Sequence, residues 1–199
     1  HPPTHCEVIR VVTAAQMRAA VLERMGEATL VIKAAAVADY RPVVVSDHKL
    51  KRSGPLTLEL APTEDILAEV ASMRRPGQLI VGFAAETENT RENGRAKLMR
   101  KGADAIVVND VSGENSGIDA DRNAVTFLTP STSIELPDMP KRKLADRILD
   151  EIVTLRRPRA LLVEIDRKAE GGSAPEGTAQ IPVAEPRTLS KARRQVVVE

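Results

Sequence analysis

The sequence predicts an α/β fold, in which a doubly wound, mostly parallel sheet is flanked by helices and carries a small β-hairpin extension. Short apolar runs rich in β-branched residues alternate along the chain with stretches whose apolar residues recur at helical spacing. This alternation is typical of parallel strands, because a helix must connect them. With 199 residues, 42% of them hydrophobic, the chain is long enough for one ordinary core.

The first half of the chain is expected to hold two strand–helix units. Thr13 can cap a helix, and Gly26 can end it. The expected elements are, in order, a strand at 7–12, the helix after Thr13, a strand at 28–32 that is covered on both faces, a half-exposed strand at 56–60, and a helix from a Thr63 cap to about Arg74.

The second half continues the alternation and closes with a hairpin, whose turn contains Pro130 and Ser131. Its expected elements are a strand at 78–83, a helix at 89–101, a strand at 103–108, hairpin strands at 123–128 and 133–136, and a helix at 141–155. We therefore expect a Rossmann-like domain over residues 1–158. The remaining residues, 159–199, are expected to form a mostly disordered tail.

Composition argues against several classes of partner. The 29 basic and 28 acidic residues nearly cancel and aromatic residues make up 2% of the chain, which disfavours nucleic acid. No apolar run is long enough to span a bilayer, so no membrane partner is expected. The single cysteine, Cys6, rules out an intrachain disulfide and is typical of a cytoplasmic protein. Because the chain lacks an initial methionine and enters a strand at once, we expect it to be a fragment of a longer polypeptide.

The most informative segment runs from Lys33 to Arg41 and leads to a charged loop at 49–52. Its alanines follow a buried strand, so a flat ligand could lie against the backbone at the strand's carboxyl end, where open parallel sheets bind ligands. Asp39 could accept hydrogen bonds from a ribose or a base amino group, or it could cap a turn. The loop cations could meet a developing negative charge, or form an ordinary charged surface.

A second strand end, at 82–87, adjoins the basic helix at 89–101. Phe83 supplies an aromatic ring, while Lys97 and Lys101 lie four residues apart and so share one helix face. An anion between these lysines would relieve their repulsion, so the set could hold a nucleotide base and its phosphates. The alternative is a solvated basic face.

The chain lacks the motifs of several other kinds of site. The histidines have no ligand spacing with carboxylates or with Cys6, which argues against zinc. The chain contains no Gly-x-Ser-x-Gly elbow, no Walker-type lysine loop and no Gly-x-Gly-x-x-Gly stretch. In a doubly wound fold the last of these belongs to the first strand–helix turn, which we expect to lie upstream of residue 1.

Several motifs occur in a specific order over residues 7–157. They read Ala-Ala-Val-Ala-Asp-Tyr-Arg, a Lys-x-Lys-basic run ten residues after the acid, Pro-Thr-Glu-Asp-Ile, Gly-Phe-Ala-Ala-Glu-Thr-Glu-Asn, Ala-Lys-(x)3-Lys-Gly-Ala-Asp and Val-Asn-Asp-Val. Together they resemble the phosphopantothenoylcysteine synthetase family. In bacteria this family is usually the C-terminal half of a bifunctional coenzyme A biosynthesis protein, fused to a flavin-dependent decarboxylase.

The resemblance implies a ligase that joins 4'-phosphopantothenate to cysteine. In this family CTP activates the carboxylate as an acyl-cytidylate with loss of pyrophosphate, and the cysteine amine then displaces CMP. The resemblance also implies that Mg²⁺ accompanies the triphosphate and that the enzyme is a homodimer. FMN would belong only to the fused decarboxylase domain of the parent chain, which this chain does not contain.

Carried over to this chain, the resemblance implies a catalytic role for Lys49, as a loop cation used in the second step. The implied nucleotide-binding residues are Lys33, Ala34, Ala35, Asp39, Lys49, Thr63, Glu64, Asp65, Ile66, Phe83, Lys97 and Lys101. Ala36 and Asn109 are weaker candidates for substrate binding, and no metal ligand is assigned.

The chain departs from the family pattern in two places. Thr63-Glu64-Asp65-Ile66 stands where many members have Asn-Pro-Asp-Ile. The family's Gly-rich phosphate turn and catalytic Asn would lie before the first strand seen here, so we expect the chain to be inactive as it stands. The alternative to a ligase is a non-catalytic nucleotide-binding Rossmann-like module.

Overall fold

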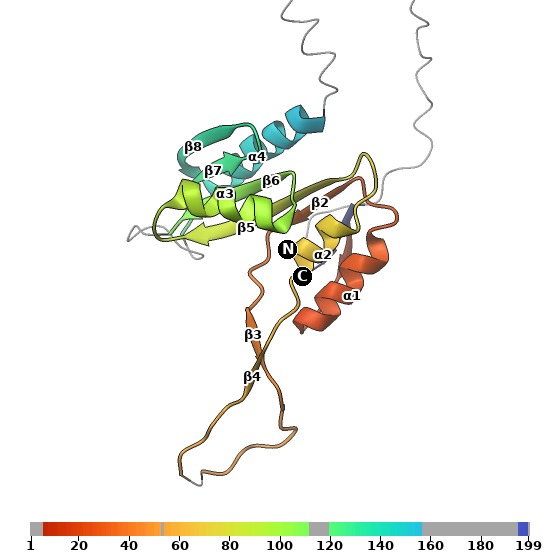
Figure 1. Ribbon diagram of the computed structural model, residues 1–199, viewed down its shortest axis with the longest axis vertical. Helices are drawn as coiled ribbons and strands as arrows, with labels where there is room; N and C mark the ends of the chain where they lie inside the picture. Colours follow the sequence, from red (N-terminus) through yellow and green to blue (C-terminus); the bar gives the residue numbers. More distant parts are fainter. Residues whose placement is uncertain (1–5, 53, 112–119, 157–194, 199) are drawn as a thin grey trace, which may run out of the picture.

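The structure is a computed structural model that describes residues 6–52, 54–111, 120–156 and 195–198 (Figure 1). Its main feature is a five-stranded sheet in the order β2-β5-β6-β7-β8. The helices are α1 (Ala14–Arg24), α2 (Ile66–Ser72), α3 (Thr90–Lys101) and α4 (Lys141–Arg156). The strands are β1 (Cys6–Ile9), β2 (Leu30–Lys33), β3 (Tyr40–Pro42), β4 (Leu60–Pro62), β5 (Leu79–Glu86), β6 (Ala105–Asp110), β7 (Arg122–Leu128), β8 (Ser133–Pro140) and β9 (Gln195–Val198).

The sheet is mixed, and its parallel part is built from the predicted strand–helix units. β2 pairs in parallel with β5, and β5 in parallel with β6, whereas β7 and β8 add as an antiparallel hairpin. The turn of this hairpin is closed by a hydrogen bond of 3.0 Å from the Thr129 N–H to the Thr132 carbonyl oxygen. The α/β fold with its hairpin extension is therefore confirmed.

Helices cover both faces of the sheet, as a doubly wound fold requires. Side chains from α2 and α3 pack with Ile80 and Val108 on one face. Side chains from α4 pack with Val81 and Val107 on the other face. Because successive residues of a strand point to opposite faces, even-numbered residues of β5 and β6 face α2 and α3, and odd-numbered residues face α4.

Two glycines allow the helices to approach the sheet closely. A Cβ atom at Gly82 in β5 would lie 2.4 Å from Leu67 Cδ2 of α2. A Cβ atom at Gly94 in α3 would lie 2.5 Å from Val108 Cγ2 and 2.7 Å from Leu128 Cδ1. Glycine at these positions therefore brings α2 and α3, the helices next to the predicted nucleotide site, into direct contact with the sheet.

A two-stranded arm replaces the single strand expected at 56–60. β3 and β4 pair antiparallel and extend away from the sheet, with the connecting loop at the far end (Figure 1). The expected strand was misplaced because the alternation of 56–60 was taken for a half-buried surface, yet Leu56 and Leu58 are 68% and 63% exposed. β3 was missed altogether, since its three residues carry no periodic signal.

The expectations for both ends of the chain also need correction. The first strand is shorter than predicted, and it pairs in parallel with β9, so residues 195–198 of the expected tail form a strand. Residues 157–194 and 199 lie outside the described residues. β2 lies at the edge of the five-stranded sheet and Ile32 is 38% exposed, so this strand is not covered on both faces. No helix among the described residues is long and apolar enough to cross a bilayer.

Candidate functional site

The carboxyl edge of the parallel strands brings several predicted residues together. Lys33 ends β2 in register with Gly82, and Glu86 ends β5. The even-numbered Gly82 and Glu86 face α2 and α3, so Lys33 lies on that side of the sheet as well. A cavity of about 750 Å³ reaches this edge and is lined by Lys33, Ala34, Ala35 and Ile66, among others. Its size is typical of small-molecule sites.

An ionic cluster of Lys33, Asp65 and Lys101 joins three elements at this edge. Asp65 caps α2 by accepting a hydrogen bond of 3.2 Å from the Ala68 N–H, and it forms an ion pair with Lys101 of α3. Burial raises the pKa of Asp65, but the hydrogen bonds from Lys101 and Ala68 outweigh it and hold this pKa below its ordinary value. The carboxylate is therefore charged at neutral pH.

Lys33 is hydrogen-bonded to the backbone of the alanine segment beside this cluster. Its Nζ donates a hydrogen bond of 3.0 Å to the Ala35 carbonyl oxygen, which lies in the stretch expected to face a base. Burial lowers the pKa of Lys33, and the charge of Lys101 adds to this, while Asp65 and Asp39 oppose it. Among the described contacts, Lys33 thus holds the backbone of the loop and is electrostatically coupled to Asp39, Asp65 and Lys101.

Lys97 is held by a carboxylate that the sequence did not single out. Its Nζ lies 2.6 Å from Oε1 of Glu86, whose side chain is 12% exposed. The same oxygen has no well-aligned hydrogen bond among the described residues, so the contact is mainly electrostatic. Glu86 lies within one of the family-like motifs, and a charged residue closing an otherwise apolar strand was the available signal.

The predicted helix cap at Thr63 was wrong. α2 begins at Ile66 and is capped by Asp65, because a carboxylate accepts the N–H groups of a first turn well. The Thr63 N–H donates to the Asp39 carbonyl oxygen at 2.8 Å and is not free for a ligand. Glu64 is exposed, whereas the Ile66 side chain is buried in the core, so only the backbone of Ile66 can face a ligand.

Other predicted residues lie apart from this cluster. Phe83 and Asn109 are odd-numbered and so lie on the α4 side of the sheet, at the same carboxyl edge. Phe83 is 37% exposed, and the buried Oδ1 of Asn109 has no hydrogen-bond partner among the described residues. Ala36 is exposed in the segment after β2. Lys49 is exposed in the connection between β3 and β4, and this arm extends away from the sheet (Figure 1).

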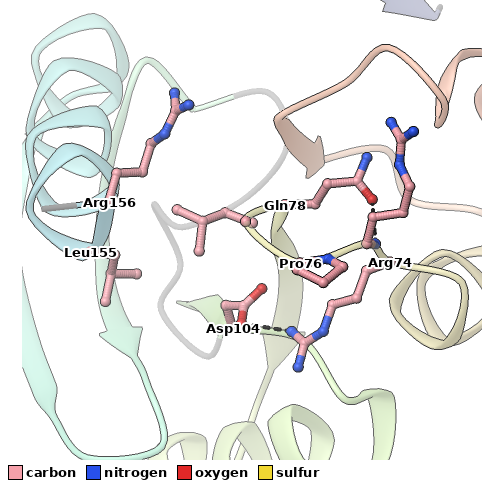
Figure 2. A pocket seen from close by; sticks show the side chains of 9 residues that line it. Arg74, Pro76, Gln78, Asp104, Leu155 and Arg156 are labelled. Atoms are coloured by element: carbon pink, nitrogen blue, oxygen red, sulfur yellow. Dashed lines mark hydrogen bonds and ion pairs between the residues drawn. The ribbon is translucent and has the colours of Figure 1, made fainter. Parts of the chain in front are cut away.

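A second cavity, of about 680 Å³, opens at the opposite edge of the sheet and contains none of the predicted residues (Figure 2). The turn before β5, Asp104 and the end of α4 line it. Two of its arginines already make contacts between elements. Arg74 forms an ion pair with Asp104 at 2.6 Å, and Arg156 donates a hydrogen bond to Thr29 Oγ1 at 3.2 Å. We therefore assign this cavity a structural role.

The described residues contain no group of three or more His, Cys, Asp or Glu side chains that could enclose a metal ion. Asp65, whose side chain is 43% exposed, does offer a hard oxygen ligand near Lys101. Such a donor set fits a Mg²⁺ ion that enters on phosphate oxygens and keeps several waters, and does not fit a protein cage.

Known proteins resemble this chain over most of its length. The coenzyme A biosynthesis bifunctional protein CoaBC of Bacillus subtilis is 44% identical over 158 residues, which cover 78% of this chain and 39% of that protein. CoaBC of Escherichia coli K12 is 38% identical over 156 residues, which cover 76% and 38%. The chain thus spans about two fifths of the length of these relatives.

A solved structure agrees with these relatives. The crystal structure of the C-terminal domain of CoaBC is 36% identical and superposes with a TM-score of 0.63, over 78% of this chain and 68% of that one. The family model of the DNA/pantothenate metabolism flavoprotein C-terminal domain matches residues 1–155. This chain therefore belongs to the DNA/pantothenate metabolism flavoprotein C-terminal domain family.

Proposed function

We propose that the protein carrying this chain is a phosphopantothenate–cysteine ligase of coenzyme A biosynthesis. The observation that carries the proposal is the cluster of Lys33, Asp65 and Lys101 at the carboxyl edge of the sheet, within a chain related to CoaBC proteins. Cationic side chains at this edge suit a nucleoside triphosphate, since open α/β sheets bind nucleotides there. The proposal places the enzyme in the cytoplasm, in keeping with its single cysteine.

In the proposed reaction a carboxylate oxygen of 4'-phosphopantothenate attacks the α-phosphorus of CTP, and pyrophosphate leaves. The cysteine amine then attacks the acyl carbon, loses a proton, and CMP leaves with the electron pair of the broken C–O bond. The backbone of Ala34 and Ala35 would face the cytosine, and Asp39 would accept a hydrogen bond from the ribose. Lys97 and Lys101 would neutralise the phosphates through charge-assisted hydrogen bonds.

Magnesium belongs to this proposal as part of the nucleotide substrate. Bound to the triphosphate, it would supply positive charge against the leaving pyrophosphate. FMN is assigned to a decarboxylase domain elsewhere in the parent polypeptide, as the word "bifunctional" in the relatives' names suggests. It has no proposed role in this chain.

The first prediction tests the ligase assignment directly. The full-length protein, incubated with phosphopantothenate, cysteine, CTP and Mg²⁺, is expected to release one CMP and one pyrophosphate for each amide formed. Omitting cysteine should abolish CMP release and limit pyrophosphate release to one turnover, because the acyl-cytidylate then has no acceptor. CTP binding without pyrophosphate release, with both substrates present, would instead support the non-catalytic nucleotide-binding module.

We also propose that the protein is a homodimer and that the arm formed by β3, β4 and their connecting loop takes part in the interface. A two-stranded ribbon is marginally stable by itself in water. Yet this arm exposes a series of large apolar side chains: Tyr40, Val43, Val44, Val45, Leu50, Leu56, Leu58 and Leu60. Covering them with a second copy would remove this apolar surface from water.

The second prediction follows from the arm. Replacing Leu56 and Leu58 together by Asp is expected to shift the protein towards a monomer, because two carboxylates would have to be buried in the interface. Light scattering coupled to size-exclusion chromatography measures the change. The control replaces Leu149 and Val153 of α4, which are also exposed, by Asp. An unchanged mass for the arm variant would exclude these leucines from the interface.

A further inference from the structure

Glu86 is a mostly buried carboxylate to which the proposed reaction assigns no step. We propose that Glu86 is a specificity-determining residue that makes the site prefer the Mg²⁺ complex of a nucleoside triphosphate over the free triphosphate. This inference rests on the proposed function, because it takes Lys97 as a phosphate-binding residue. It adds a role for the carboxylate that faces this lysine.

The fold fixes Glu86 next to Lys97. Glu86 is the last residue of β5, and its carbonyl oxygen accepts a hydrogen bond of 3.0 Å from the Val111 N–H. Its Oε1 lies 2.6 Å from Lys97 Nζ, and only 12% of the side chain is exposed. The carboxylate is therefore largely shielded from solvent, and its charge lies beside the lysine.

The second predicted phosphate-binding lysine has the same arrangement. Lys101 forms an ion pair with Asp65, which caps α2. Lys33, Lys97 and Lys101 are matched in number by Asp39, Asp65 and Glu86, and Asp110, in register with Glu86 on the same side of the sheet, adds a fourth carboxylate. An anion entering the site thus meets lysines that are already neutralised.

A fixed carboxylate beside a phosphate-binding lysine discriminates between the two forms of a nucleotide. The free triphosphate carries about four negative charges, and binding one Mg²⁺ removes about two of them. Repulsion from a fixed carboxylate grows in proportion to the charge of the ligand, so Glu86 disfavours the free form more strongly than the complex. Because Glu86 is mostly buried, solvent screens this repulsion only weakly.

The substitution Glu86→Gln distinguishes an effect of the negative charge of Glu86 from an effect of its contact with Lys97. The amide has the shape of the carboxylate and keeps an oxygen that can accept from Lys97, but it carries no charge. If Glu86 only positioned Lys97, both forms of the nucleotide would respond alike. If its charge selects the metal complex, the free form should gain more affinity than the complex does.

The third prediction is measured by calorimetric titration of the full-length protein with CTP in excess Mg²⁺ and with CTP in EDTA. Glu86→Gln is expected to tighten metal-free binding about tenfold and to change binding of the Mg²⁺ complex less than about threefold. The ratio of the two dissociation constants should therefore fall. Glu88→Gln, an exposed change of the same type two residues away, is the matched control and should leave the ratio unchanged.

A second variant guards against loss of folding in the first. Lys97→Gln leaves Glu86 without its cation, so the ratio of metal-free to Mg²⁺-bound dissociation constants should rise, opposite to the effect of Glu86→Gln. An unchanged ratio in either folded variant would overturn the inference while leaving the ligase proposal standing. Failure of the unmodified protein to bind CTP in both conditions would refute the proposed function, and the inference with it.

Discussion

Lys49→Gln is expected to lower turnover of the full-length enzyme by about a hundredfold, the usual effect of removing one donor that stabilises transition-state charge. The dissociation constant of CTP should stay within about twofold, because an interaction made mainly in the transition state does not contribute to ground-state binding. Lys49 is exposed, and the loop between β3 and β4 that contains it extends away from the sheet (Figure 1), so it has no described contact with the nucleotide site.

Steady-state kinetics, with CTP binding measured separately by titration, checks this prediction. Lys51→Gln and Arg52→Gln remove cations from the same exposed loop and are expected to change turnover less than about threefold, the range of an altered surface charge. Turnover at the level of the unmodified enzyme would show that Lys49 is surface charge. An equal loss for all three variants would point to the general charge of the loop and not to one positioned ammonium group.

Lys97→Ala and Lys101→Ala should each weaken CTP binding by about 1.5 to 3 kcal/mol, which is roughly a 10- to 150-fold rise in dissociation constant. The structure makes the two changes unequal. Lys97→Ala removes the cation beside Glu86, whose side chain is only 12% exposed, and so leaves a mostly buried negative charge without a partner. Asp65, the partner of Lys101, has a side chain that is 43% exposed, so water can hydrate it when Lys101 is removed. We therefore expect the larger loss for Lys97→Ala, together with lower thermal stability.

Titration of each folded variant with Mg²⁺-CTP and Mg²⁺-ATP gives the measurement. Arg100→Ala removes an exposed cation from the same helix and serves as the control, with an expected change below about twofold. Because the two lysines serve one ligand, the double variant is expected to lose less than the sum of the single losses. Wild-type affinity in both single variants would place the phosphates elsewhere, and equal affinity for CTP and ATP would contradict the pyrimidine assignment.

Local patterns determined the part of the fold in which each element carries its own signal. The buried runs that became β5 and β6 and the amphipathic stretch that became α4 were recognisable because apolar spacing reports directly on burial. The hairpin of β7 and β8 followed from alternation and from its turn residues. Local patterns did not predict β3 and β4 correctly. These strands pair residues about 20 positions apart, so their pairing leaves no periodicity in the local sequence.

For the candidate site, too, some features follow from the sequence and others only from the tertiary structure. The sequence by itself determined which residue types end the strands: the alanines after Lys33, the ring at Phe83 and the lysines of α3. Only the tertiary structure decided that Asp65 caps α2 and pairs with Lys101, that Glu86 pairs with Lys97, and that Phe83 lies on the other face of the sheet from these lysines. The reason is physical: strand alternation and helix spacing are local properties, whereas which charges meet depends on how α2 and α3 pack against the sheet.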